Sequence, residues 1–276
     1  EMDEEAGTYR FTIRVENVSD ETGTTVNGSG IPISPGTFAA HFDQAPGGAD
    51  VTFFPTGEAA PTGIERIAED GDPAAHHEAL GMLTGVTVPF SPGAFAAHTD
   101  DVQAFDTGEK ASKGVEAVAE DGDPAALADE LSMEGSDQII HSGIFNTPTG
   151  ADGPGPIGPD ASYTFTVNAT PGHLLTFVTM YVQSNDLFYA LSTNGYDLFD
   201  ENGDPVSGDL TGTLCLYDAG TEGDEEPGAG LNQAPRQGAS DTGPEGEGAV
   251  SQVNGEDDGY RYPDPATLIK VTITPQ

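Results

Sequence analysis

The sequence predicts a mainly β protein, an antiparallel β-sandwich with a duplicated helical insertion between its early strands. Three observations predict this class. Apolar and polar residues alternate in several short segments, which is the period of a strand with one buried face. Turn-forming residues separate these segments, with 37 Gly and 21 Pro among 276 residues. One segment is present twice. Short strands divided by turns are typical of a sandwich.

Strands are expected in the short segments whose residues alternate between apolar and polar or are continuously apolar. In the first segment, residues 9–16, the side chains of Phe11, Ile13 and Val15 share one face. Other segments alternate in the same way or are continuously apolar, and the continuous ones predict strands buried on both faces or a corner between two sheets. In chain order, these further segments are residues 163–167, 174–182, 187–191, 213–217 and 269–273.

An internal repeat has copies at residues 32–80 and 89–131. The clearest matches are Ser34-Pro35-Gly36 with Ser91-Pro92-Gly93, and Gly71-Asp72-Pro73 with Gly122-Asp123-Pro124. Gly ends a helix, Asp caps the next one and Pro suits its first turn, so each copy predicts two short helices. Two copies are too few for a solenoid. The repeat therefore predicts a duplicated insertion inside a single domain of residues 1–276.

The charge of the chain limits its partners. There are 47 acidic and 8 basic residues, and the net charge is −39. So few cations exclude a phosphate-binding surface for nucleic acid and a polybasic lipid-binding segment. Self-repulsion of this size weakens a compact fold in dilute buffer, whereas the Debye length falls to about 3 Å at 1 M salt. We therefore expect a folded, salt-adapted (halophilic) protein, because the aromatic residues fall in patterned segments rather than in a disordered composition.

The cellular location is expected to be extracellular or at the cell surface. Cys215 is the one cysteine, so an intramolecular disulfide and a cysteine-rich metal site are excluded. The sequence starts at Glu1 without a charged and apolar leader, as a secreted protein does after its signal peptide is removed. No apolar run approaches the 18 residues or so of a membrane span, so no insertion into a membrane is expected.

Carboxylates placed to bind a metal ion are the strongest candidates for functional residues in the sequence. Asp218 directly follows the strand at 213–217, and an Ala-Gly turn can bring Glu222 back toward it. Asp186 lies between two apolar strands and can reach the same end of a sandwich. Carboxylates held at strand ends suit calcium, which takes six to eight oxygen ligands. The long acidic loop at 219–259 predicts either disorder or a loop held by something other than apolar packing, for which a bound cation is one candidate.

The sequence lacks the common catalytic motifs, and its histidines are expected to have structural roles. There is no Gly-x-Ser-x-Gly elbow, phosphate-binding glycine loop or His-Glu-x-x-His motif, and no enzymatic activity is predicted. His41 and His98 both follow Phe-Ala-Ala, and we expect them to close a turn through backbone hydrogen bonds. His76 and His77 are expected on the surface, because neighbouring positions of a helix point in different directions.

The chain resembles the spondin amino-terminal domain family, named for the matrix proteins F-spondin and mindin. The resemblance implies a sandwich similar to calcium-dependent lipid-binding domains, a bound calcium, and roles in adhesion and extracellular matrix. Matched by motif, the calcium ligands are Asp186, Asp218 and Glu222. The chain departs from animal members in Leu187, in Glu222 where they have Asp, in lacking their cysteines and in its duplicated insertion. The stretches that carry the resemblance are residues 34–41, 183–188, 216–222, 232–236 and 260–274.

The function predicted from these features is that of a secreted calcium-binding structural or adhesive protein. A sharper hypothesis is a subunit of an extracellular filament assembled by strand exchange. Both ends of the chain are strand-like, residues 1–8 form an arm before the first strand, and an open strand edge can accept a strand from a neighbour. Other surface proteins or glycans are further candidate partners. The alternatives are a carboxylate-dependent hydrolase, in which Asp186 and Glu222 would face each other across an open pocket, and a glycan-binding module.

Overall fold

A computed structural model shows two compact units, one of residues 1–38 with 54–77 and one of residues 39–53 with 78–276. We describe each unit by itself. The prediction of a single domain of residues 1–276 stays a prediction. The structure describes residues 2–3, 8–9, 11–18, 32–39, 57, 59–83, 89–133, 138–225, 227–228, 230–234, 236–240, 242–246, 248–253, 260, 262 and 264–276.

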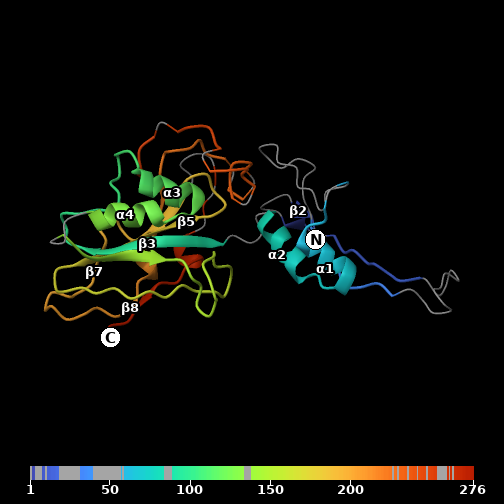
Figure 1. Cartoon of the computed structure of the whole chain (residues 1–276), viewed down its shortest axis with the longest axis horizontal. Coiled ribbons are helices and arrows are strands. Elements are labelled where there is room, and N and C mark those ends of the chain that lie inside the picture. Colours follow the sequence, from blue (N-terminus) through green and yellow to red (C-terminus); the bar gives the residue numbers. More distant parts are fainter. Residues whose placement is uncertain are drawn as a thin grey trace. The chain divides into compact units, whose positions relative to one another are not determined.

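The mainly β class predicted from the sequence is confirmed (Figure 1). The early elements are β1 (Met2–Asp3), β2 (Thr8–Tyr9), α1 (Thr62–Asp70) and α2 (Ala74–Leu83). The elements that follow are β3 (Phe90–His98), α3 (Lys113–Asp121), α4 (Ala125–Met133), β4 (Ile139–Phe145), β5 (Leu174–Tyr181), β6 (Leu187–Ala190), β7 (Tyr196–Asp197), β8 (Gly208–Asp209), β9 (Cys215–Asp218), β10 (Ser251–Gln252) and β11 (Thr272–Ile273). Two 3₁₀ helices cover Thr211–Thr213 and Pro265–Thr267.

The second unit is built on a seven-stranded antiparallel sheet. Its strands follow the order β10-β9-β6-β5-β3-β4, and β7 also pairs with β5. The continuously apolar segments 174–182 and 187–191 correspond to β5 and β6, and residues 213–217 overlap β9. All four residues of β6 are buried. The expectation that β5 and β6 are buried on both faces is confirmed.

The two faces of this sheet carry different layers. On one face, Ala94 and Val178 of the sheet pack in one apolar cluster with Val115 of α3 and Leu127 of α4. On the other face, Phe95 and Phe177 pack with extended segments, including residues 163–169 and 269–273. Figure 1 shows α3 and α4 on one side of β3, with β8 on the other. The sheet is thus sandwiched between a helical layer and a second β layer.

The second β layer contains a segment whose alternation the sequence predicted but which forms no strand. Tyr163, Phe165 and Val167 are half-buried, and the residues between them are exposed. The ring of Phe165 stacks on Phe95 and on Phe145, with centroid distances of 4.4 and 5.0 Å. The side chains therefore follow a strand's period, while the backbone has no strand partner among the described residues.

The predicted helix pairs are confirmed in both repeat copies. Gly71 and Gly122 end α1 and α3 with φ of 67° and 65°, a left-handed conformation that glycine adopts without strain. The carboxylates of Asp72 and Asp123 accept the backbone N–H groups two residues later, at 3.0 and 2.9 Å. These caps start α2 and α4 where the Gly-Asp-Pro motif places them.

The two repeat copies differ in the surroundings of the segment that contains Ser-Pro-Gly. In the second copy this segment is β3, which pairs with β4 and β5, and Phe95 is 4% exposed. In the first copy, residues 32–39 form no strand, and Phe38 is 92% exposed. Nearly identical sequences thus occupy a sheet centre in one copy and an exposed position in the other.

The histidines of the repeat only partly follow expectation. His98 bonds the carbonyl of Thr99 through Nδ1 at 2.8 Å, which confirms its role in a turn, and His41 lies outside the described residues. His77 is exposed as predicted. The surface prediction is wrong for His76, which is buried with its Nδ1 2.7 Å from Thr37 Oγ1. Thr37 lies in the first segment of the same copy, so His76 ties that segment to α2.

Candidate metal centre

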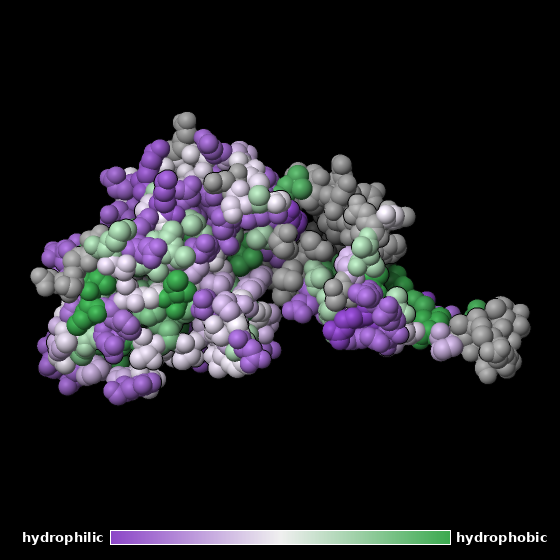
Figure 2. All heavy atoms as spheres, in the orientation of Figure 1, coloured by the Kyte–Doolittle hydropathy of each residue, from purple (hydrophilic) through white to green (hydrophobic). Residues whose placement is uncertain are grey.

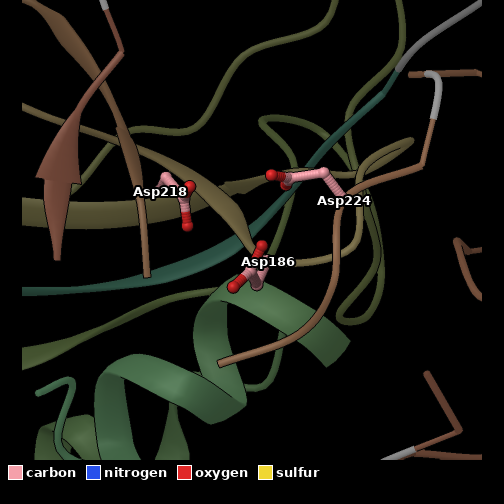
Figure 3. A group of neighbouring side chains, drawn as sticks. All are labelled: Asp186, Asp218 and Asp224. Atoms are coloured by element: carbon pink, nitrogen blue, oxygen red, sulfur yellow. The ribbon is translucent and has the colours of Figure 1, made fainter. Parts of the chain in front are cut away.

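Three aspartates converge where neighbouring strands of the sheet end. Asp186 immediately precedes β6, and Asp218 is the last residue of β9, whose partner in register is Leu187. Asp224 lies in the loop that follows β9. One carboxylate oxygen from each residue lies within 4.8 Å of the other two (Figure 3). The sequence correctly anticipated that Asp186 and Asp218 come together.

Asp186 is the most unusual residue of the group, because its carboxylate is completely buried. Its Oδ2 accepts the N–H of Thr221 at 2.7 Å, the N–H of Glu222 at 3.0 Å and the hydroxyl of Thr221 at 3.2 Å. Its Oδ1 is buried and has no hydrogen-bond partner among the described residues. Burial raises the pKa of Asp186, and the bonds from Glu222 and Thr221 oppose that rise.

A tight turn after β9 brings the loop onto Asp186. Asp218 Oδ1 accepts the N–H of Gly220 at 2.6 Å, and the N–H of Ala219 donates to the Asp186 carbonyl at 3.1 Å. Gly220 has a φ of 68°, and a Cβ there would lie 2.8 Å from the backbone nitrogen of Ala249. Glycine is therefore required at this position by its conformation and by the close approach of the chain.

The side chain of Glu222 points elsewhere. Its Oε1 accepts the N–H of Gly243 at 2.9 Å, and its Oε2 lies 3.4 Å from the Asn185 amide. Its backbone N–H is what reaches Asp186. The converging group contains Asp224 in its place, and a ligand role for Glu222 stays a prediction. Sequence reasoning missed Asp224, because in a chain with 47 acidic residues it looks like ordinary solvated surface.

A second set of acidic groups lies beside the three aspartates. A cavity of about 390 Å³ is lined by Glu116, Glu120, Glu222 and Glu245, with Lys110 as its cation. The pKa of Glu120 is raised to about 7, mainly by burial; the hydrogen bond with Thr221 opposes the rise, and the charges of Glu222, Glu116 and Asp186 add to it. The region around Asp186 thus has a strongly negative potential, which favours a cation.

The positions of Asp186 and Glu222 differ from those expected in a carboxylate-dependent hydrolase. That hypothesis needs Asp186 and Glu222 facing each other across an open pocket. Glu222 lines the cavity, but Asp186 does not, and it is enclosed by the turn after β9. No other pair of residues was singled out for this chemistry in the sequence.

The described part of the loop at 219–259 is held by a polar network. The Arg236 guanidinium donates to Gly230 O at 2.6 Å and to the side-chain oxygens of Gln183 and Gln233 at 3.1 Å. Gln183 and Gln233 are fully buried. The Glu225 N–H donates to Asn185 Oδ1 at 2.9 Å, next to Asp186. These contacts hold this part of the loop by polar interactions, which is one of the two alternatives expected for it.

Replacing Glu120 by Gln is expected to stabilise the calcium-free protein at neutral pH. Below the unfolded-state pKa, near 4.5, Glu120 is protonated in both states and the two proteins should be equally stable. As pH rises to 7 the unfolded state ionises first, so the parent protein loses stability and Glu120→Gln does not. Above pH 7 we therefore expect Glu120→Gln to be the more stable of the two proteins. Urea unfolding at pH 4 and pH 7.5 measures the two stabilities, and an equal difference at both pH values would contradict this expectation.

Comparison with protein families identifies the class of this chain. The family model described as Spondin_N matches residues 84–236, which is more than half of the 276 residues. The chain belongs to the spondin amino-terminal domain family. The matched part includes the second repeat copy and the three converging aspartates. No functionally curated protein matches the chain.

Family membership indicates an extracellular protein of the matrix or adhesion type. Among the described residues, the helices are too short or too polar to cross a membrane. The resemblance seen in the sequence placed its first stretch at residues 34–41, in the first repeat copy. The family match begins at residue 84 and therefore includes the equivalent stretch of the second copy instead.

Proposed function

We propose that this protein is an extracellular structural or adhesive protein whose spondin domain binds a calcium ion between Asp186, Asp218 and Asp224. The observation that carries the proposal is the buried Oδ1 of Asp186, which has no hydrogen-bond partner in the described part of the chain. A buried carboxylate is costly unless a cation or a proton compensates it. Two further carboxylates beside it increase the cost, and a divalent cation would compensate all three.

The donor set suits calcium better than a softer metal. All three side chains offer carboxylate oxygens, and no histidine or cysteine belongs to the group. Calcium takes six to eight oxygens, so backbone carbonyls and water would complete the shell. Glu222 is a candidate fourth carboxylate, because its backbone already touches Asp186 and its longer side chain could rotate from Gly243.

Bound calcium would act as a structural crosslink. Asp186 belongs to the start of β6, Asp218 to the end of β9 and Asp224 to the loop beyond. A cation between them would join two strands to the long acidic loop. Extracellular modules bind calcium with dissociation constants of about 10⁻⁴ to 10⁻³ M, so such a site would be filled outside the cell and empty inside it.

The proposal includes salt adaptation and self-association into an extracellular filament. The net charge of −39 supports the first, because salt screens the repulsion between like charges. The exposed apolar residues of segment 11–18 support the second: Phe11, Ile13 and Val15 are about 80% exposed. Large apolar side chains in such positions mark interaction surfaces.

Removing calcium is expected to lower the melting temperature at constant salt, and Asp218→Ala should abolish most of that response. The chelator removes the cation that would compensate the converging carboxylates, which destabilises the turn after β9. Scanning calorimetry in about 1 M salt, where surface charges are screened, measures the effect. Asp152→Asn is the matched control, since Asp152 is exposed and outside the group.

The same measurement separates the two candidate ligand sets. Asp224→Ala should reduce the calcium response if Asp224 is the third ligand, and Glu222→Ala should reduce it if the family motif holds in full. A parent protein whose melting temperature is the same with calcium and with chelator would refute the proposed site.

A further inference from the structure

The first unit contains an extended, strand-like segment at residues 11–16, which pairs with no strand among the described residues. Residues 11–18 are extended and exposed, and Phe11, Ile13 and Val15 are 80, 81 and 81% exposed. Hydrophobic atoms gather in Figure 2 along the extended blue trace of Figure 1. We call residues 11–16 the donor segment. Its apolar residues alternate, so that as a strand it would offer one fully apolar face.

The second unit has a β layer with open edges. In the part of the chain that is described, the backbone amides and carbonyls of residues 163–167 make no hydrogen bond to other backbone groups. Among the described residues, β11 pairs with β8 and with no other strand, which leaves its other edge open. Both segments pack on the same face of the main sheet, with Phe165, Val167, Ile269 and Val271 only half-buried. We call residues 163–167 with β11 the acceptor layer.

Donor and acceptor match in pattern and in charge. The outward residues Thr164, Thr166 and Asn168 are uncharged, so no carboxylate of segment 163–168 would oppose an added strand. Arg10 and Arg14, two of the eight basic residues, lie in or next to the donor segment. Arg14 pairs with Glu16 within the donor segment, and Arg10 precedes it, so the donor segment has no excess negative charge to oppose its approach to the acidic second unit.

We infer that the donor segment of one copy adds as a strand to the acceptor layer of a second copy, an inference that rests on the self-association in the proposed function. Adding the strand would satisfy backbone groups at the open edges and cover the half-buried apolar residues. Along the chain, the first repeat copy lies between the donor segment and β3. The donor segment and the acceptor layer belong to different units. Each added copy leaves one free donor and one free acceptor, which produces an open chain.

Two full-length variants test the inference by complementation. Ile13→Asp places a charge on the apolar face of the donor and leaves the acceptor intact. Thr166→Pro removes an edge amide from the acceptor and leaves the donor intact. Met133→Asp is the matched control, because Met133 is 78% exposed and lies at the end of α4, outside both segments. Sedimentation velocity in about 1 M salt with calcium gives the distribution of species.

Wild-type protein and Met133→Asp should form concentration-dependent oligomers. Ile13→Asp and Thr166→Pro should each be monomeric, and their mixture should form dimers, since one supplies a donor and the other an acceptor. Thr164→Pro serves as a second acceptor variant if circular dichroism shows that Thr166→Pro is unfolded. A monomeric wild type, oligomers of Ile13→Asp like those of the wild type, or a mixture that stays monomeric would overturn the inference.

Failure of strand donation is distinguishable from failure of the calcium site. The melting temperature of Ile13→Asp should rise with calcium as much as that of the wild type, because the donor segment is not part of the metal centre. A calcium response without oligomers refutes only strand donation. Oligomers without a calcium response refute only the metal centre.

Discussion

Asp186→Asn should change stability in opposite directions with and without calcium. In chelator the variant should be more stable than the parent, because a neutral amide replaces a buried carboxylate whose Oδ1 has no partner among the residues that the structure describes. Its oxygen can accept the N–H groups of Thr221 and Glu222 as Oδ2 does now. Its amide nitrogen would then lie in the place of Oδ1 and could donate to the neighbouring carboxylates. We expect a gain of about 2–4 kcal/mol in the free energy of unfolding.

With saturating calcium the order should reverse. The parent gains the binding free energy of the ion, whereas the variant has lost the central ligand and should gain little. Urea unfolding of both proteins, with calcium and with chelator, measures all four free energies. Asp152→Asn is again the control and should not respond in either condition. A variant that is less stable than the parent by the same amount in both conditions would show that Asp186 is structural and binds no ion.

Gly93→Ala should be strongly destabilising, whereas the equivalent change in the first copy, Gly36→Ala, should be nearly neutral. A Cβ at Gly93 would lie 2.3 Å from the Phe145 ring and 2.3 Å from the Val178 carbonyl oxygen. Both neighbours belong to strands that flank β3, so relief requires the sheet to shift. Overpacking of this kind costs about 3 kcal/mol. At Gly36 there is nothing within 4 Å.

The pair of variants is a matched test of which repeat copy occupies the sheet. Each glycine follows Ser-Pro in the same motif, so the substitutions are chemically identical. Thermal unfolding in about 1 M salt should show a clear drop for Gly93→Ala and a change within about 0.5 kcal/mol for Gly36→Ala. A larger effect at Gly36 would mean that the first copy rather than the second lies between β4 and β5, and equal effects would contradict the different surroundings of the two glycines.

Local signals in the sequence were sufficient for the elements that depend on local physics. The Gly-Asp-Pro motifs predicted the ends of α1 and α3 and the starts of α2 and α4, because capping involves neighbours a few residues apart. Continuous apolar segments predicted β5 and β6 for a similar reason, since burial on both faces excludes polar residues from every position.

What the sequence could not predict depends on tertiary neighbours. The two Ser-Pro-Gly segments are almost identical, so only the strands beside them distinguish Phe95 in the core from exposed Phe38. Residues 163–167 have a strand's alternation but lack a strand partner among the described residues. At the metal centre, the strand ends placed Asp186 and Asp218 together, but the path of the loop after Gly220 decides whether Glu222 or Asp224 turns toward them.

A calcium titration by isothermal calorimetry tests the central claim most directly. The chelator-treated wild type in about 1 M salt, which screens non-specific binding to surface carboxylates, should bind one calcium ion per chain in a saturable step. Asp186→Asn should show no such step under the same conditions. A wild type with only weak, non-saturating heats, or an Asp186→Asn protein that binds calcium as the wild type does, would contradict a calcium site between the ends of β6 and β9.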